Sequence, residues 1–467
     1  MIETEEEAEL KELREQIAKT TIELMRLVGE RNSLASKAGK LKSRAALPID
    51  NEQVEDSLVS AVMAECSRVG VSRSAGLKIL NTLLSESKRV QGGAAGKGVE
   101  SPMGAFAKAK EMERLGKKLI RLDVGEPDFK PPRAVVEACC DALLSSKTRY
   151  TMPRGIPELT SALQGYLKRK SGYDANEDEV IVTTGGRFAI YSAIAAVVGE
   201  GESAIVIDPN WPAYKDTLRQ IGAKPTIIRT TLEDSWAPSV EKIAEAVRPN
   251  TTAIVLSYPN NPSGKIIGSD TFNAIVDVAN DHNLTVISDE AYVDYAYKDC
   301  PSVLHSKAKQ FILAGTFSKS WSMTGFRVGY AVSSKHVVDK MLDMTSLMLT
   351  SVPEFIQYGA IKALESEAVV ETNSRTMKER IEAVSKELDG LDTLEYIKPD
   401  GAMYIFPRAK QQGFSASAFA TKLLEEKSVN VTPGTAFGEY QNSFRVSLGQ
   451  PKEVLLEGVR RIGALLG

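Results

Sequence analysis

The chain has 467 residues, 43% of them apolar and 25% charged, and this length exceeds what one hydrophobic core usually supports. Its formal net charge of −3 argues against a nucleic-acid-binding protein. The four cysteines lack metal-type spacing and the three histidines do not cluster, so we expect no metal site and a reducing environment.

The chain begins MIETEEEAEL, which is acidic where a signal peptide would be basic and then apolar. No apolar stretch reaches the ~18 residues that a membrane span needs. We therefore expect a cytoplasmic protein that has no contact with membranes.

Residues 5–44 carry one uninterrupted helical pattern, in which apolar residues recur at steps of three, four and seven. At about 1.5 Å per residue this helix would be roughly 60 Å long, so we expect a second copy of the chain to cover it. Two further helices are predicted over about 51–68 and 72–90, with Pro48 and Gly70 at the turns.

Three basic residues of the long helix are candidate anion ligands. Arg31 and Lys42 are eleven residues apart and share a face, whereas Arg14 points about a quarter-turn away. Spacing alone favours a solvated charged face over an anion site for these residues.

The segments LREQIAKTTIELMRLVGERNSLASKAGKLK, LPIDNEQVE and LLSESKRVQ resemble the small all-helical chorismate mutases. The resemblance covers residues 1–91 and implies an intertwined helical dimer that converts chorismate to prephenate. The positions that match the family's site are Arg14 (reaching into the partner's site), Arg31, Lys42, Glu55, Ser87 and Gln91.

The chemistry of this reaction fits these side chains. Chorismate is a dianion, and guanidinium groups bind carboxylates. The rearrangement needs no nucleophile, and Lys42 with Gln91 would stabilise the charge that develops on the ether oxygen. Two positions depart from the family pattern, because Asn51 replaces an Asp and Val54 replaces an Arg. A catalytically silent module, kept for dimerisation or sensing, is therefore an alternative.

Residues 92–101 are rich in Gly and Ala and predict a flexible linker. After it, over 102–467, short β-branched runs alternate with helical segments, as in an α/β protein with a parallel sheet. Several runs end in a polar residue, at Asn261, Asp289 and Lys319. Since ligands bind beyond the carboxyl ends of parallel strands, these residues are expected to meet in one crevice.

Such a set suits pyridoxal phosphate (PLP), which needs a lysine for covalent attachment, a carboxylate beside its pyridine nitrogen and groups that bind its phosphate. Lys319 and Asp289 supply the first two. The groups expected to bind the phosphate are Gly185, Gly186, Thr316, Ser318 and Arg327.

Ordered motifs across 102–467 resemble the fold-type I aminotransferases of the aspartate and aromatic group: LDVGEPDF, RYTMPRGIPEL, TTGGR, DPNWPAY, YPNNPSG, SDEAY, SKSWSMTGFRVGY, DGAMYIFP and FRVSLG. The resemblance implies a large domain around a parallel or mixed sheet, a smaller α+β domain, and PLP as cofactor.

By this resemblance Lys319 attaches the cofactor and moves the substrate proton, while Asp289 keeps the pyridine nitrogen protonated. Asn261 and Tyr292 would bind the cofactor's phenolic oxygen, and Trp211 would stack on its ring.

The same resemblance assigns substrate and partner contacts. Arg445, helped by the backbone at Gly125, would bind the substrate α-carboxylate. Tyr150 would reach the phosphate held by the neighbouring subunit, which implies a homodimer or a higher homo-oligomer. Arg187 could bind a second carboxylate of the substrate. It could equally contact the cofactor phosphate or form a surface salt bridge.

The fusion suggests a bifunctional enzyme of aromatic amino-acid biosynthesis. Its second module would transfer an amino group from glutamate or aspartate to prephenate, phenylpyruvate, 4-hydroxyphenylpyruvate or oxaloacetate. One alternative is an aspartate aminotransferase with a silent helical appendage. A PLP-dependent transcription regulator is disfavoured, because residues 1–91 hold 14 Lys/Arg and 15 Asp/Glu, a net charge of −1.

Overall fold

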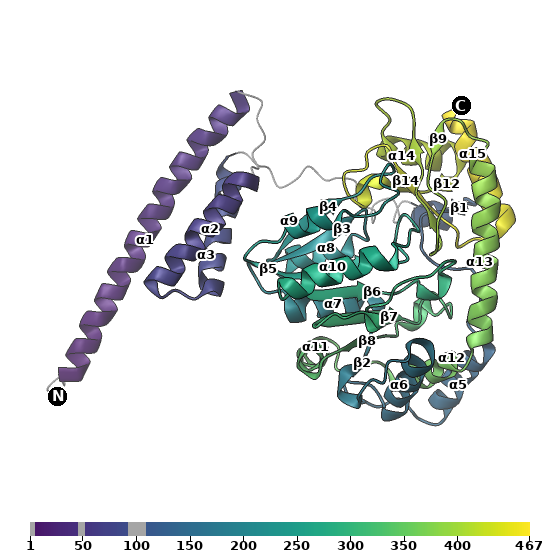
Figure 1. Cartoon of the computed structure of the whole chain (residues 1–467), viewed down its shortest axis with the longest axis horizontal. Coiled ribbons are helices and arrows are strands. Elements are labelled where there is room, and N and C mark those ends of the chain that lie inside the picture. Colours follow the sequence, from purple (N-terminus) through teal and green to yellow (C-terminus); the bar gives the residue numbers. More distant parts are fainter. Residues whose placement is uncertain (1–4, 45–51, 92–108) are drawn as a thin grey trace. The chain divides into compact units, whose positions relative to one another are not determined.

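A computed structural model describes residues 5–44, 52–91 and 109–467, and the chain divides into two compact units, Met1–Val99 and Glu100–Gly467 (Figure 1). The expected turn at Pro48, the departure at Asn51 and the predicted linker at 92–101 lie outside the described residues. Each unit is described by itself.

The first unit is all-helical, as predicted. Its helices are α1 (Glu5–Arg44), α2 (Glu52–Val69) and α3 (Arg73–Val90), within one residue of the expected bounds. Gly70 makes the turn between α2 and α3 with φ of +73°, a conformation that suits glycine. A Cβ on Gly39 would lie 2.7 Å from the Gln91 backbone, so glycine allows α1 and α3 to approach closely.

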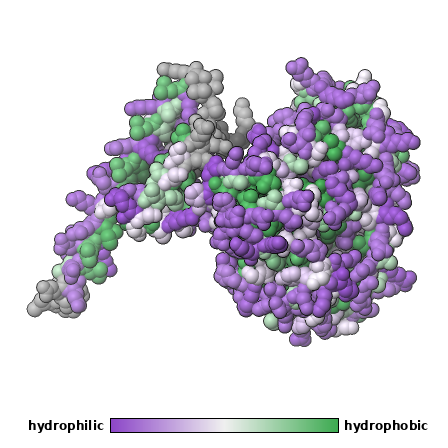
Figure 2. All heavy atoms as spheres, in the orientation of Figure 1, coloured by the Kyte–Doolittle hydropathy of each residue, from purple (hydrophilic) through white to green (hydrophobic). Residues whose placement is uncertain are grey.

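The long helix α1 keeps much of its apolar surface exposed. Figure 2 shows apolar side chains along it, and nine of them are 46–66% exposed: Leu10, Leu13, Ile17, Ile22, Leu24, Met25, Leu27, Leu34 and Leu41. An amphipathic helix is stabilised chiefly by packing of its apolar face.

The second unit is built on a seven-stranded sheet of order β2-β8-β7-β6-β5-β3-β4. The strands are β2 (Val180–Thr183), β3 (Ser203–Asp208), β4 (Lys224–Arg229), β5 (Thr251–Ser257), β6 (Thr285–Asp289), β7 (Phe311–Thr316) and β8 (Gly329–Ser333). Only β8 opposes its neighbours in this sheet; the others share one direction. The sheet is thus mixed, the second of the two arrangements that the sequence predicts.

Helices cover both faces of the sheet, which explains its continuous apolar strands. Along β5, Ile254 and Leu256 pack on one face, and Ala253 and Val255 pack on the other. The first face contacts α6 (Pro157–Ser171), α10 (Ser269–Asp281) and α12 (Glu354–Leu364), with α5 (Arg133–Leu144) and α9 (Val240–Glu245) alongside. The second contacts α7 (Gly185–Val197), α8 (Ala213–Gln220) and α11 (Lys335–Met348).

A smaller α+β part has its own apolar core. Its helices are α13 (Glu367–Leu388), α14 (Ala416–Lys427) and α15 (Lys452–Leu466). Its strands pair as β1 (Ile120–Arg121) with β12 (Val429–Asn430), β9 (Leu394–Glu395) with β11 (Arg408–Ala409), and β14 (Phe444–Ser447) with both β10 (Tyr404–Ile405) and β13 (Thr432–Pro433). The predicted fold class is confirmed. Within the described ranges, no helix is long and apolar enough to cross a bilayer.

Candidate active sites

The carboxyl ends of β3, β5, β6 and β7 lie along one edge of the sheet, because these strands are parallel. Since β8 runs the other way, it begins at this edge, where Gly329 pairs with both Thr183 of β2 and Thr316 of β7. Arg327, two residues before β8, therefore joins the residues that follow the other strands.

These residues enclose a cavity of about 280 Å³. Its lining is Gly125, Gly186, Arg187, Trp211, Tyr214, Ser257, Asn261, Asp289, Ala291, Tyr292, Thr316, Ser318, Lys319, Arg327, Tyr404 and Arg445. All residues predicted for this site line the cavity except Gly185, which starts α7 beside it, and Tyr150.

Lys319 lies in the cavity with its amine buried. Its Nζ donates a hydrogen bond to the carbonyl oxygen of Gly125 at 2.5 Å. Burial, with the nearby charge of Arg445, lowers the pKa of Lys319 to about 8. A substantial fraction of the amine is thus unprotonated close to neutral pH, the form that attacks carbonyl groups.

Asp289 ends β6 as a buried carboxylate. Its Oδ2 accepts a hydrogen bond from the Tyr214 hydroxyl at 2.6 Å, and its Oδ1 accepts one from the Ala291 N–H at 3.1 Å. Burial raises the pKa of Asp289 despite these two donors. A cation placed against this carboxylate would stabilise its ionised form.

The start of α7 forms a cradle for an anion. No side-chain hydrogen bond from the N-cap Thr184 covers the helix end. Gly185 has φ of +76°, and a Cβ there would lie 2.6 Å from Arg327 Nη2; a Cβ on Gly186 would lie 3.0 Å from Thr316. The glycines thus leave room for backbone N–H groups, the helix dipole and a guanidinium to meet one anion. Thr316 Oγ1 also donates to Ser318 Oγ at 3.0 Å.

Arg445, on β14, forms the opposite end of the cavity. Its Nη1 donates to Asn261 Oδ1 at 2.9 Å, and its guanidinium lies 4.4 Å from the centre of the Tyr404 ring and 5.0 Å from that of Phe437. The hydroxyls of Tyr404 and Tyr292 are hydrogen-bonded at 2.6 Å. Two elements from the smaller part thus complete a site that the large sheet begins.

A third guanidinium belongs to Arg187, which lies 4.6 Å from the centre of the Trp211 ring. Burial and the charge of Arg327 lower its pKa. This stacking on Trp211 holds Arg187 at the cavity wall.

Tyr150 lies away from the cavity and is 88% exposed. It sits in a segment tied to residue 351, since the Thr151 N–H donates to Ser351 Oγ at 3.3 Å. Exposed apolar side chains lie near Tyr150 and near Ser351 in sequence. They are Leu143, Leu144, Met152, Leu347, Met348 and Leu349.

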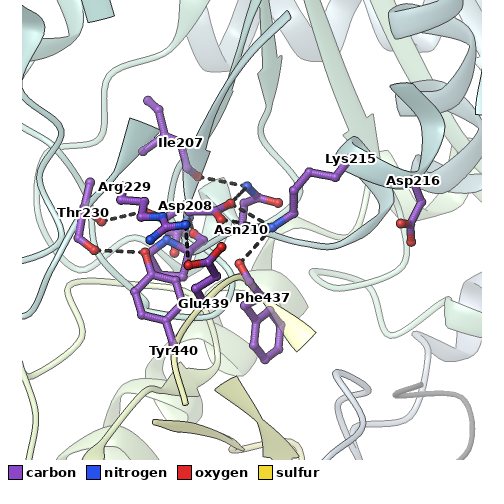
Figure 3. Close-up of polar contacts among 12 residues, drawn as sticks. Ile207, Asp208, Asn210, Lys215, Asp216, Arg229, Thr230, Phe437, Glu439 and Tyr440 are labelled. Carbon is purple, nitrogen blue, oxygen red and sulfur yellow. Dashed lines mark hydrogen bonds and ion pairs between the residues drawn. The ribbon is translucent and has the colours of Figure 1, made fainter. Parts of the chain in front are cut away.

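A buried ion pair holds the Trp211 loop against the smaller part. Figure 3 shows Lys215 directed at Asp208, with Nζ 3.0 Å from Oδ1, and at the carbonyl oxygen of Phe437, 3.2 Å away. Asn210 also donates to Asp208, and burial raises the pKa of this carboxyl. We call this set the 208–437 latch; its residues are Asp208, Asn210, Lys215 and the Phe437 backbone.

Two outer contacts flank the 208–437 latch in Figure 3. The Tyr440 hydroxyl donates to the Thr230 carbonyl at 2.9 Å, and Arg229 pairs with Glu439 at 2.5 Å. Since Trp211 lies between Asn210 and Lys215 in sequence, the latch fixes the loop that presents its ring. Through Phe437 it also supports the position of Arg445.

The residues of the cavity fit PLP, the cofactor that the sequence motifs imply. Lys319 would attach its carbonyl carbon, Asp289 would face its pyridine nitrogen, and the cradle at Gly185 and Gly186 with Arg327 would hold its phosphate. The chemistry that the bound cofactor supplies is withdrawal of electrons from the substrate Cα.

The helical unit has a second cavity, of about 320 Å³. It is lined by Arg31, Leu34, Ala35, Ala38 and Lys42 of α1, Val54, Glu55 and Leu58 of α2, and Leu84, Ser87, Lys88 and Gln91 of the α3 region. Every residue predicted for this site lines it except Arg14, which lies on an exposed stretch of α1, roughly 25 Å along the helix from Arg31.

Polar contacts order this second cavity. Arg31 Nη1 donates to the Leu83 carbonyl at 2.6 Å and also contacts Ser87 Oγ. Within the described part of the chain, the buried Oε1 of Gln91 has no hydrogen-bond partner. A buried amide oxygen without a partner is costly, so this side chain suits contact with a polar ligand.

Sequence reasoning missed Tyr214 and Tyr404 in the first cavity and Lys88 in the second. Both tyrosines stand inside quoted motifs, DPNWPAY and DGAMYIFP, and were available as signals. Lys88 lies beside Ser87 but resembles any surface lysine in the sequence.

Two family models match the chain. The class I and II aminotransferase model matches residues 117–462, and the chorismate mutase type II model matches residues 13–92. Among curated proteins, the chain is 34% identical over 363 residues to an aspartate aminotransferase of Pyrococcus horikoshii, covering 76% of this chain and 92% of that protein.

A second relative is an aspartate/prephenate aminotransferase of Thermus thermophilus, 32% identical over 366 residues, covering 77% of this chain and 94% of that protein. Among solved structures, an aspartate aminotransferase of Thermotoga maritima superposes with a TM-score of 0.74 at 32% identity, covering 78% of this chain and 96% of that one.

Proposed function

The chain belongs to the class I and II aminotransferases and carries a chorismate mutase type II domain, and on this premise we propose that it makes prephenate and transaminates an acid of the same pathway. The chain is an enzyme with an aminotransferase activity and a chorismate mutase activity, and its aminotransferase unit uses PLP. The proposal concerns the substrates, the residues that act on them and the assembly.

In the aminotransferase site, the chain's own residues would bind, orient and move a proton. Arg445 would hold the substrate α-carboxylate and so place Cα near Lys319. The Lys319 amine, whose pKa burial lowers to about 8, would accept the Cα proton and hold it. Tyr214 would keep Asp289 oriented through its hydrogen bond.

Three guanidinium groups in one cavity carry the substrate proposal: Arg187, Arg327 and Arg445. Arg327 is committed to the cradle and Arg445 to the α-carboxylate, which leaves Arg187 for a second carboxylate of the substrate. Aspartate, glutamate, oxaloacetate and prephenate all have two carboxylates. The printed name of the Thermus relative includes both aspartate and prephenate. We therefore propose glutamate or aspartate as donor, and prephenate ahead of phenylpyruvate or 4-hydroxyphenylpyruvate as acceptor.

In the mutase site, Arg31 would hold a carboxylate of chorismate. Lys42 and Gln91 would stabilise the charge that develops on the ether oxygen as the C–O bond breaks. Arg14 would come from a second copy of the chain. This assignment is supported by the exposed apolar face of α1, which pairing of two helical units would cover.

We further propose a homodimer through the aminotransferase unit. Tyr150 would then reach the neighbouring cradle, and the exposed apolar residues around it would be buried. A chain with two self-associating units could also link dimers into a larger assembly.

The experiment incubates the protein with PLP, chorismate and glutamate and identifies the products by mass spectrometry. We expect prephenate and its amino product, arogenate. A Lys319→Ala variant should still accumulate prephenate but form no arogenate. Chorismate loss at the uncatalysed rate would show instead that the helical unit is a silent appendage of an aminotransferase. Amino transfer to oxaloacetate alone would overturn the proposed acceptor.

A further inference from the structure

The third helix presents one stripe of side chains to the cavity of the helical unit. Leu84, Ser87, Lys88 and Gln91 all line it. Their spacing of three and four residues places them on one face of the helix. Lys88 thus belongs to the cavity wall, although nothing in its sequence context distinguishes it.

The ammonium group of Lys88 is held against α2. Its Nζ lies 2.9 Å from Glu55 Oε1, and the Glu55 side chain is only 14% exposed while that of Lys88 is 41% exposed. Val54, the position where the resembling family carries an arginine, lines the same cavity beside Glu55. Position 54 of α2 therefore carries no cation, but Lys88 of α3 brings one to the same end of the cavity.

The charges of the cavity wall give a second argument. The charged residues in its lining are Arg31, Lys42 and Lys88, which are cationic, and Glu55, which is anionic. Their sum is two positive charges from one chain, and Arg14 of a second copy would add a third. Lys88 offsets the negative charge that Glu55 places in this wall, which would otherwise repel a dianionic substrate.

We infer that Lys88 is a substrate-positioning residue of the mutase site, which supplies the cation missing at Val54 and holds the Glu55 carboxylate in place at the cavity wall. This inference rests on the proposed mutase function. The rearrangement breaks one C–O bond and forms one C–C bond within the substrate, so Lys88 exchanges neither a proton nor an electron with it.

The test measures kcat and KM for chorismate in the full-length, PLP-loaded protein. Lys88→Met keeps the aliphatic stem and removes the charge. We expect KM to rise roughly ten- to hundredfold, as for loss of a charge-assisted hydrogen bond, with a smaller change in kcat. Lys88→Arg should restore KM, and so should Val54→Arg added to Lys88→Met.

Lys78→Met is the matched control, since Lys78 is an exposed lysine of the same helix outside the cavity, and it should leave KM unchanged. Aminotransferase activity and helical content of each variant report on folding. An unchanged KM in Lys88→Met, or no rescue by either arginine variant, would overturn the inference.

A binding measurement separates this inference from the mutase activity itself. Calorimetry would use a bicyclic ether dicarboxylate shaped like the transition state. If the natural sequence binds it without converting chorismate, and Lys88→Met binds it at least about tenfold more weakly, the role of Lys88 holds and only the proposed activity fails. If the natural sequence neither binds nor converts, both fail.

Discussion

The hydroxyl of Tyr214 donates a 2.6 Å hydrogen bond to the buried carboxylate of Asp289. Burial raises the pKa of Asp289, and this hydrogen bond acts in the opposite direction because it stabilises the ionised carboxylate. In Tyr214→Phe the carboxylate loses this donor, so its contact with a protonated pyridine weakens. We expect the dissociation constant for PLP to rise about ten- to hundredfold, measured by fluorescence titration. Tyr166→Phe, a buried tyrosine outside the cavity, should change nothing; equal effects in both variants would contradict the role.

The lowered pKa of Lys319 predicts how cofactor uptake depends on pH. A lysine with a pKa of about 8 is mostly protonated below that pH and mostly neutral above it. The rate of PLP attachment to the cofactor-free protein should therefore rise roughly tenfold per pH unit below about 8 and then level off. Absorbance of the attached cofactor follows the reaction. A rise that continues to the ordinary lysine pKa, near 10.4, would show that burial does not set the reactivity.

Arg187 should discriminate between acids with one and two carboxylates. In Arg187→Gln we expect kcat/KM for aspartate and prephenate to fall about a hundredfold, from loss of a bidentate ion pair, while phenylpyruvate is little affected. Coupled assays on each substrate measure this ratio. Arg219→Gln, which alters an exposed arginine of α8, is the control. An equal loss for all substrates, together with weaker PLP binding, would place Arg187 on the phosphate instead.

The 208–437 latch should contribute strongly to stability. Lys215→Met leaves Asp208 buried without its cation, and breaking such a pair costs about 3–5 kcal/mol in free energy of unfolding. Chemical denaturation measures this loss. Burial already raises the pKa of Asp208, and without the cation it would rise further, so the folded state would bind more protons than the unfolded one. The variant should therefore be most destabilised at high pH and recover as the pH falls.

Two further variants test this account. Asp208→Asn combined with Lys215→Met removes both charges and should recover part of the lost stability. Lys410→Met, on the exposed surface, should be neutral. If Lys215→Met is as stable as the natural protein at all pH values, the ion pair of Asp208 and Lys215 does not hold the Trp211 loop.

The proposed placement of Arg14 in a partner's mutase site predicts complementation. Arg14→Ala and Arg31→Ala should each abolish mutase activity. A mixed dimer would contain one site with both arginines intact, so an equal mixture that exchanges subunits should recover about a quarter of the natural rate. Steady-state chorismate loss measures this recovery. If the mixture stays inactive while mixed dimers are detected by native mass spectrometry, each site uses its own Arg14.

Much of the fold follows from local sequence. The three helices of the first unit begin and end within one residue of their predicted bounds, because apolar periodicity and the turn at Gly70 are local signals. The crevice was also predictable, since Asp289 ends β6 and Lys319 comes three residues after the end of β7. The reversed direction of β8 was not, because a short apolar strand reads the same in either direction.

The partners of the site residues were not readable from the sequence. Tyr214 and Asp289 are 75 positions apart, and Arg445 meets Asn261 across 184 positions. Such contacts depend on how the sheet, the helices on its two faces and the smaller α+β part pack together. Lys88 was missed for another reason, since it became distinctive only when α2 and α3 were seen to share a cavity.

In the 208–437 latch, Lys215 binds the carbonyl oxygen of Phe437 rather than its side chain. The aromatic ring at that position is buried, packs edge-on against Phe406 and lies 5.0 Å from the guanidinium of Arg445. One residue therefore supports the site twice, since its backbone binds the lysine beside the Trp211 loop and its side chain packs against Arg445. A substitution at position 437 would keep the carbonyl that Lys215 binds but would disturb the packing around Arg445.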